Sequence, residues 1–294
     1  MVIVAAAGGQ DLLQHCLKSL ERYPLAIGRC RTWVIDNATR DGTASMVKSE
    51  FPWVSLVSLP RTVGFATANN LALAQTTSPF ALLLNPDTEL CDGALDHAVA
   101  ALFERPEVAV LGVRLVRRDG SFDHAAKRSF PTILGAFGHF TGLGRASTAR
   151  GVFAQYRAPE VDELGEGEVD AVNGAFMLVR RSAMDQVGLL DPGYRLYGED
   201  LDWCYRFKAA GWTVWYDGGT TVVHVKGAST VRERGARRHR DLRVNFAFHH
   251  AMGRFYRKFR AGRNPLLDVV VYLGLTVKFV LSALSSAIGR RSLS

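Results

Sequence analysis

The stretch Leu82-Leu83-Leu84-Asn85-Pro86-Asp87-Thr88 is the part of the sequence from which the fold can be worked out. An apolar run that ends at Asn-Pro-Asp indicates a buried strand that delivers one carboxylate, Asp87, to the carboxyl end of a sheet. Open α/β folds bind their ligands at that edge. The same tripeptide is also typical of an ordinary turn, because turns select Asn, Pro and Asp for backbone reasons. On its own, the tripeptide favours the turn.

Two later features change this interpretation. The acidic stretch Gly198-Glu199-Asp200-Leu201-Asp202 and a single His224 are each predicted to lie where a strand or loop ends. Packing alone does not explain three polar sites placed in this way. Together they indicate a ligand site at one edge of a sheet.

Strands and helices alternate on both sides of the opening stretch. This alternation predicts right-handed crossovers and a mainly parallel sheet. Asp36 then lies at the carboxyl end of the second strand, and Asp200 at or near the start of a helix, where an ionised carboxylate is stabilised. Predicted strands lie at residues 2–5, 32–35, 54–59, 82–84, 106–115, 170–181, 214–216 and 221–223. Predicted helices lie at 12–20, 42–49, 66–75 and 201–211, and a further helix is predicted to begin at Ser182.

The composition indicates a globular protein that functions in a reducing compartment. The chain has 294 residues, of which 48% are hydrophobic and 22% are charged, enough to bury a substantial core. Its four cysteines show no CxxC pair or metal-ligand spacing, which disfavours a disulfide framework or a zinc ribbon. Met1 runs directly into a predicted strand without a basic segment, so we expect no secretory signal.

The net charge of +8 is concentrated near the C-terminus. Between Arg232 and Arg263 there are eleven Lys and Arg residues against two acidic residues, and the apolar stretch 266–288 follows. A basic run next to an apolar one favours an anionic membrane surface over nucleic acid, for which no motif is present. The sequence therefore predicts two regions, 1–230 and 231–294.

The apolar stretch 266–288 is long enough to cross a bilayer. Asp268 and Lys278 interrupt it, however, and Lys278, Ser282, Ser285 and Gly289 follow one side of the helix. This weak amphipathic pattern favours a helix that lies in the membrane interface. A core helix and a helix that joins two copies of the chain in a homo-oligomer are the alternatives.

Six features in order resemble family 2 glycosyltransferases of the GT-A fold, most closely the bacterial rhamnosyltransferases of cell-wall and O-antigen assembly. The resemblance covers residues 2–230. The features are residues 36–42, 64–70, 84–87, 173–181 and 198–202, followed by His224.

The resemblance implies an inverting transfer of a sugar from a nucleotide diphosphate sugar to a hydroxyl group. It favours dTDP-rhamnose as donor and a lipid-linked acceptor at the cytoplasmic face of the cell membrane. UDP-hexose, UDP-N-acetylhexosamine and UDP-galactofuranose are the alternative donors. Such a reaction needs a divalent cation, Mg²⁺ or Mn²⁺, for the departing diphosphate and a carboxylate base for the attacking hydroxyl.

The resemblance also assigns roles to individual residues. Asp200 matches the general base, with Glu199 the next candidate, and Asp87 matches the metal-bridging acid, with His224 a further ligand or diphosphate contact. The alternatives are a turn or capping role for Asp36 and a packed histidine at His224. Asp202 is expected to face solvent or to pair with Arg206. The expected nucleotide-sugar contacts are Asp36, Asn37, Asp41, Gly64, Asn69, Asn85, Asp87, Asn173 and Gly174.

The sequence departs from the family pattern in two places. Ala5-Ala6-Ala7-Gly8 replaces a polar segment after the first strand, and Thr62 stands where an Asn often precedes Val-Gly-Phe. A non-catalytic nucleotide-sugar-binding protein is therefore the rival interpretation. The Gly8-Gly9 pair lacks the G-x-G-x-x-G spacing of a dinucleotide-binding fold.

Overall fold

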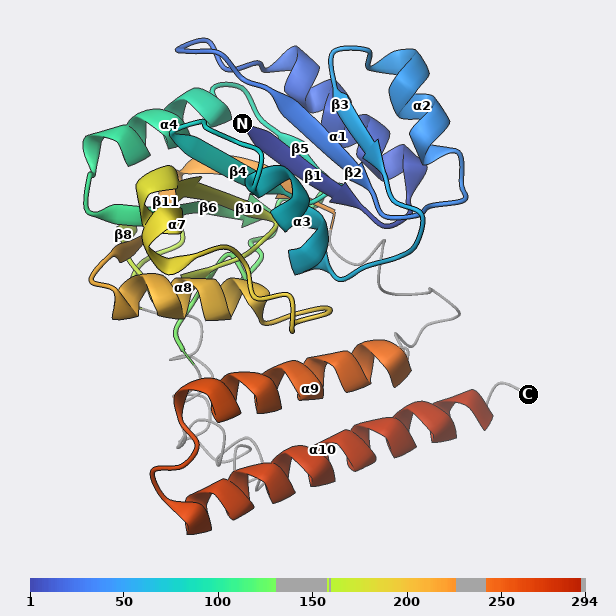
Figure 1. Cartoon of the computed structure of the whole chain (residues 1–294), viewed down its shortest axis with the longest axis vertical. Coiled ribbons are helices and arrows are strands. Elements are labelled where there is room, and N and C mark those ends of the chain that lie inside the picture. The colour runs from blue at the N-terminus through green and yellow to red at the C-terminus, as the bar shows by residue number, and fades with distance from the viewer. Residues whose placement is uncertain (131–157, 159, 226–241, 292–294) are drawn as a thin grey trace.

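The computed structural model describes residues 1–130, 158, 160–225 and 242–291. Its centre is a nine-stranded mixed sheet, and helices lie on both of its faces (Figure 1). Two further helices at the C-terminus lie below this α/β layer. The predicted α/β fold class is confirmed.

The N-terminal half of the sheet is parallel, with the strand order β3-β2-β1-β4. Because crossovers are right-handed, helices α1 and α2 cover one face and α3 the other. The predicted elements of this half are confirmed. The bounds are β1 (Val2–Ala6), α1 (Gln10–Arg22), β2 (Thr32–Asp36), α2 (Thr43–Glu50), β3 (Ser55–Ser58), α3 (Phe65–Leu73) and β4 (Phe80–Leu84).

The other half of the sheet adds antiparallel strands. β10 (Phe176–Arg180) runs antiparallel between β4 and β6 (Val108–Val116), and β11 (Thr213–His224) runs parallel to β6. The short strands β5 (Thr88–Leu90) and β8 (Glu166–Glu168) pair antiparallel with β11. A separate two-stranded sheet joins β7 (Lys127–Arg128) to β9 (Ala171–Val172).

Three features of this half differ from the sequence prediction. The predicted strand 170–181 is divided into β9 and β10, because the chain turns at residues 173–175, where Oδ1 of Asn173 accepts the Ala175 N–H. Residues 214–216 and 221–223 belong to one strand, β11, with an irregular register between Asp217 and Thr221. Gly218 and Gly219 interrupt the local pattern, but pairing with β6 on both sides keeps the strand continuous. The pattern also missed β5 and helix α4 (Ala94–Glu104).

The sheet is buried because helices cover it. Every residue of β1 is buried, as are Leu82, Leu83 and Leu84 of β4. This explains why these strands appear in the sequence as continuous apolar runs rather than as an alternating pattern.

Four helices follow β10 in the described part of the chain: α7 (Arg181–Val187), α8 (Glu199–Ala209), α9 (Leu242–Phe259) and α10 (Pro265–Arg291). Helix α9 lies between α8 and α10 (Figure 1). On its sheet side, Phe255 and Phe259 pack against Tyr205 of α8. On its other side, the hydroxyl of Tyr256 donates a hydrogen bond to Asp268 of α10 at 2.7 Å.

Helix α10 exposes apolar side chains, with Leu266 80% and Leu273 62% exposed. Within the described residues, its segment Pro265–Ala283 is the one stretch with the length and composition of a membrane span, with a mean hydropathy of 1.9. The first part of the predicted basic run 232–263, up to residue 241, and the 230/231 boundary lie outside the described residues.

Candidate active site

The carboxyl ends of the strands gather the predicted site residues along one edge of the sheet. Ala6 of β1 pairs with Asp36 of β2, and Val4 pairs with Leu84 of β4, so these strands end side by side. Further along, Val223 of β11 pairs with Val116 of β6. Asp36, Asp87 and His224 therefore follow strands that end at the same edge.

Asp87 and His224 meet in space as the sequence predicts. Nε2 of His224 lies 3.4 Å from Oδ1 of Asp87, and Nδ1 lies 3.2 Å from Oδ2 of Asp123. All three side chains are at least nine-tenths buried. Burial would lower the pKa of His224, but the carboxylates of Asp123 and Asp87 outweigh it and raise that pKa to about 9. The imidazole is therefore protonated at neutral pH and compensates two buried negative charges.

Asp123 is a member of this cluster that sequence reasoning missed. Its backbone N–H donates to Leu115 O as the chain turns back after β6, and this return places its carboxylate beside His224. The sequence marks only the turn at residues 119–121. No local pattern indicates which strand the following carboxylate will face.

The side chains of Asp87 and His224 fit a divalent cation that binds together with a diphosphate. The described residues contain no group of three or more His, Cys, Asp and Glu side chains that could hold a metal by itself. Mg²⁺ sites commonly use one or two carboxylates and take their remaining ligands from substrate phosphates and water. A pocket of about 280 Å³ beside His224 is lined also by Arg117, Arg118, Asp119 and Val225, so two guanidinium groups and one carboxylate lie at the same place.

Asp200 lies in the first turn of α8, which confirms its predicted place near a helix start. Its Oδ1 accepts the backbone N–H of Leu201 at 2.8 Å. Its Oδ2 accepts Arg128 at 2.6 Å and the backbone N–H of Gly174 at 3.3 Å. The helix N-terminus and the guanidinium both stabilise the carboxylate, so Asp200 is held in one orientation as an anion.

Glu199 precedes Asp200 and is buried at the start of α8. It is 8% exposed, and its Oε2 has no hydrogen-bond partner among the described residues. Burial, followed by the nearby charge of Asp200, raises the pKa of Glu199 to about 8. At neutral pH most of the Glu199 carboxyl is therefore protonated, whereas Asp200 has Arg128 as its ion-pair partner.

Arg128 is the second residue that the sequence did not reveal. It lies on β7, 72 residues before Asp200, and also donates to Val172 O at 2.7 Å. Its side chain is 12% exposed. Only the pairing of β7 with β9 brings it to α8, and no motif surrounds it in the sequence.

The predicted residues between the two acidic sites also meet. The backbone N–H of Asn85 donates to Ala175 O, and Oδ1 of Asn173 accepts the Ala175 N–H at 2.8 Å. Gly174 follows Asn173 directly and contacts Asp200. The junction of β4 and β10 thus connects the strand end that carries Asp87 to the helix that carries Asp200.

The predicted nucleotide contacts near β2 hold the loops of this edge together. Oδ1 of Asp36 accepts the Thr39 N–H at 3.0 Å, and the Asn37 side chain exchanges two hydrogen bonds with the backbone of Val63. Asp41 accepts the Gly9 N–H at 3.0 Å and also binds Thr43. These bonds shape the end of the sheet where a nucleotide would lie.

Gly64 and Asn69 act at the start of α3. A Cβ at Gly64 would come within 3.0 Å of the Arg195 backbone, so glycine allows α3 to approach the loop that precedes α8. Asn69 is 1% exposed and donates to Phe65 O within α3. Asp202 pairs with Arg206 at 2.8 Å, as one of the two predicted alternatives states, and it is fully buried rather than solvent-facing.

The family model described as "Glycosyltransferase like family 2" matches residues 1–243. The chain belongs to this family. An N-acetylglucosaminyl-diphospho-decaprenol L-rhamnosyltransferase of Mycobacterium tuberculosis is 30% identical over 209 residues, covering 67% of this chain and 67% of that protein. The rhamnosyltransferase WbbL of Escherichia coli K12 is 28% identical over 169 residues, 55% of this chain and 60% of its own.

Solved structures of glycosyltransferases share the fold. A mannosyltransferase from Pyrobaculum calidifontis, in complex with GDP-mannose and Mn²⁺, matches 98% of this chain and 72% of its own with a TM-score of 0.59 and 17% identity. TarS residues 1–349 from S. aureus match 97% of this chain and 71% of their own with a TM-score of 0.54 and 14% identity. The predicted GT-A fold agrees with these neighbours.

Proposed function

We propose that this glycosyltransferase is a metal-dependent, inverting enzyme that moves rhamnose from dTDP-rhamnose to a hydroxyl of a lipid-linked saccharide. The observation that carries the proposal is the arrangement of Asp200. An ionised carboxylate, fixed at a helix start by Arg128 and Gly174, lies at the edge of the sheet that also bears Asp87 and His224.

The reaction is a single displacement at the anomeric carbon. The acceptor oxygen forms the new bond, its proton passes to Asp200, and the nucleoside diphosphate leaves with the electron pair of the broken bond. Asp200 fits the role of base because its carboxylate is paired with Arg128 at the helix start, whereas the raised pKa of Glu199 leaves most of that carboxyl protonated at neutral pH. The Gly174 N–H and Arg128 keep the base oriented toward the acceptor side.

Asp87 and His224 would hold the divalent cation, Mg²⁺ or Mn²⁺, together with the diphosphate of the donor. A bound cation supplies Lewis-acid stabilisation to the departing phosphates. The imidazole of His224 must lose its proton to act as a ligand, so cation binding would release a proton at neutral pH. Asp36, Asn37 and Asp41 form the end of the site proposed for the nucleoside.

The choice of donor rests on the relatives. Two of the named relatives are rhamnosyltransferases, which favours dTDP-rhamnose over UDP-hexose, UDP-N-acetylhexosamine and UDP-galactofuranose. The lipid-linked acceptor follows from the diphospho-decaprenol acceptor in the name of the Mycobacterium relative.

The exposed apolar side of α10 supports a location at the membrane. Val269 and Leu281, with Leu266 and Leu273, present apolar surface that water does not favour, and basic residues precede it in the sequence. We propose that α10 lies in the interface at the cytoplasmic face, where lipid-linked acceptors are within reach.

A panel of nucleotide sugars tests the function. Thermal stabilisation of the purified protein identifies the donor, because a ligand that binds only the folded state raises the melting temperature as its concentration increases over Kd. Release of the nucleoside diphosphate is then measured with Mg²⁺, with Mn²⁺ and with EDTA. Stabilisation without release under any of these conditions would favour the non-catalytic binding protein.

A further inference from the structure

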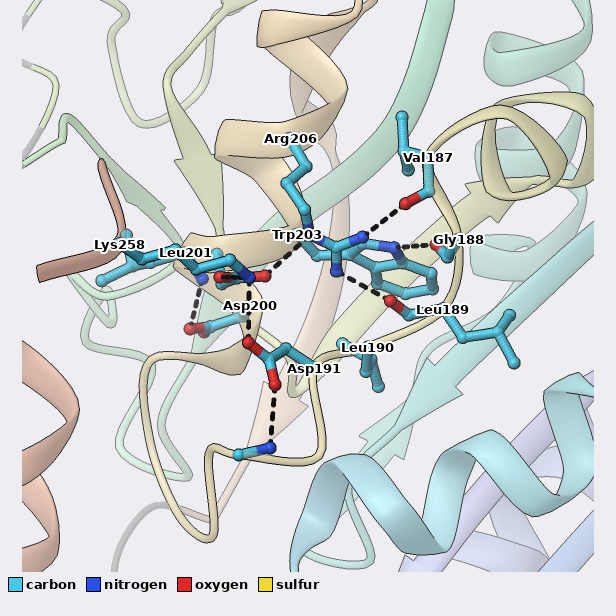
Figure 2. A network of polar contacts seen from close by, with 12 residues as sticks. Val187, Gly188, Leu189, Leu190, Asp191, Asp200, Leu201, Trp203, Arg206 and Lys258 are labelled. Carbon is cyan, nitrogen blue, oxygen red and sulfur yellow. Dashed lines mark hydrogen bonds and ion pairs between the residues drawn. The ribbon is translucent and has the colours of Figure 1, made fainter. Parts of the chain in front are cut away.

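Helix α9 lies almost wholly beyond residue 243, where the family match ends, yet it contacts the segment that leads to Asp200. Lys258 reaches from α9 between two carboxylates (Figure 2). Its Nζ lies 2.9 Å from Oδ2 of Asp191 and 2.6 Å from Oδ1 of Asp202. Arg254, one helical turn earlier, donates to both oxygens of Asp191 at 2.9 Å. We call these four residues the α9 clamp.

The clamp acts on both ends of the loop that enters the active site. Asp191 lies in the loop 188–198 between α7 and α8, and Asp202 lies in the first turn of α8 beside Asp200. Although burial would raise the pKa of Asp191, hydrogen bonds from Lys258, the Gly193 N–H and Arg254 hold it well below its usual range. Asp191 is therefore an anion that binds α9 at any pH near neutrality.

The opposite side of the same loop is fixed by the catalytic domain. The Asn70 side chain of α3 exchanges two hydrogen bonds with the backbone of Leu190, at 2.8 and 3.1 Å. Figure 2 shows Arg206 of α8 reaching Val187 O and Leu189 O, at 2.7 Å each. The loop is thus held between α3, α8 and α9, and only the α9 contacts come from outside the matched family region.

We propose that Lys258 is a positioning residue for the transfer reaction: by bridging Asp191 and Asp202 it sets where the first turn of α8 presents Asp200. The inference rests on the proposed role of Asp200 as base. Lys258 touches no reacting atom, and it acts through α8. Helix α9 would then complete the catalytic unit, while α10, which packs on α9, carries the apolar surface proposed to bind the membrane.

When Lys258 is replaced by a neutral residue, each of its two carboxylate partners still has another ion pair. Asp202 is fully buried but keeps Arg206 at 2.8 Å, and Asp191 keeps Arg254. We therefore expect Lys258→Met to fold, with its effect on the placement of α8 rather than on the core.

Three full-length variants test the proposal: Lys258→Met, Lys258→Arg and Arg257→Met. Arg257 is the exposed neighbour of Lys258 on α9, so its substitution removes the same charge from the helix without touching the clamp. With dTDP-rhamnose and Mn²⁺, we expect Lys258→Met to lower the kcat for dTDP release roughly 10- to 100-fold, since small displacements of a catalytic group have effects of that size. Donor affinity should stay unchanged, Lys258→Arg should recover most of the rate, and Arg257→Met should match the wild type.

Hydrogen exchange of the backbone amides provides a readout that needs no activity. Lys258→Met should exchange faster than the wild type in residues 188–202, and Arg257→Met should not. Unchanged exchange and unchanged kcat in Lys258→Met would each overturn the proposal. The proposal would also be overturned if donor affinity and melting temperature fell together with the rate, because a merely structural role of Lys258 predicts that result. A wild type that releases no nucleotide from any sugar donor would instead refute the proposed function, while the exchange data would still decide whether the clamp holds the loop.

Discussion

Replacing Asp200 by Asn separates the chemical role of this carboxylate from its structural one. The amide keeps the shape of the side chain but cannot accept the acceptor's proton. Removal of a general base costs about 100- to 10,000-fold in rate. This corresponds to roughly 3 to 5 kcal/mol in the activation barrier.

The same substitution also changes stability, because Asp200 is the partner of Arg128. Removing one member of a buried ion pair costs about 3 to 5 kcal/mol. Here the two side chains are 12% and 15% exposed, and Arg128 keeps its bond to Val172 O. We therefore expect a smaller loss in the free energy of unfolding, about 1 to 3 kcal/mol.

The two effects are measured separately. Denaturant unfolding gives the stability of Asp200→Asn, and dTDP release is then compared with the wild type at a temperature where both proteins are folded. Asp185→Asn is the control, since Asp185 forms an exposed pair with Arg181 whose loss should change stability by only tenths of a kcal/mol. Calorimetry should give similar donor affinities for all three proteins.

Near wild-type turnover in Asp200→Asn would refute the reasoning and move the base to another residue. Glu199 would be the next candidate, and its raised pKa makes a distinct prediction. If Glu199 were the base, the rate would rise with pH up to about 8.

Three further predictions concern the cation, the histidine and the C-terminal helix. Asp87→Ala should weaken both the metal dependence of dTDP release and the affinity for the donor, and an unchanged Mn²⁺ titration would contradict the metal role. In the metal-free protein, the pKa of His224 is raised from 6.5 to about 9, so protonation of His224 stabilises the folded state. This stabilisation is complete below pH 6.5 and is lost as the pH rises toward about 9. His224→Asn should therefore reduce the change in unfolding free energy between these two pH values. A chain that ends after Arg263 lacks α10 but keeps α9, and it should no longer sediment with anionic vesicles while retaining dTDP release. If full-length protein did not bind such vesicles either, α10 would have to pack against another copy of the chain.

The sequence by itself determined the elements of the parallel half of the sheet and the positions of most polar site residues. Hydrophobic runs such as Leu82-Leu83-Leu84 predict buried strands, and the polar residues that follow them must lie at the carboxyl edge of the sheet. The pattern from Leu201 to Gly211 predicts the helix start at Asp200. These features depend on periodicity and on residues close together in the chain, and both can be recognised in the sequence.

Only the tertiary structure decided which groups surround those residues. Arg128 reaches Asp200 across 72 positions, Asp123 reaches His224 across 101, and Lys258 reaches Asp202 across 56. None of these three partners has a local motif, and their charges are typical of solvated surface residues. Strand pairing and helix packing bring them together, and Arg128 and Asp123 become buried, which strengthens the effect of their charges on the site. The protonation of Glu199 and His224 therefore depends on folding, because the pKa of a side chain is set by its neighbours in space rather than by its neighbours in the chain.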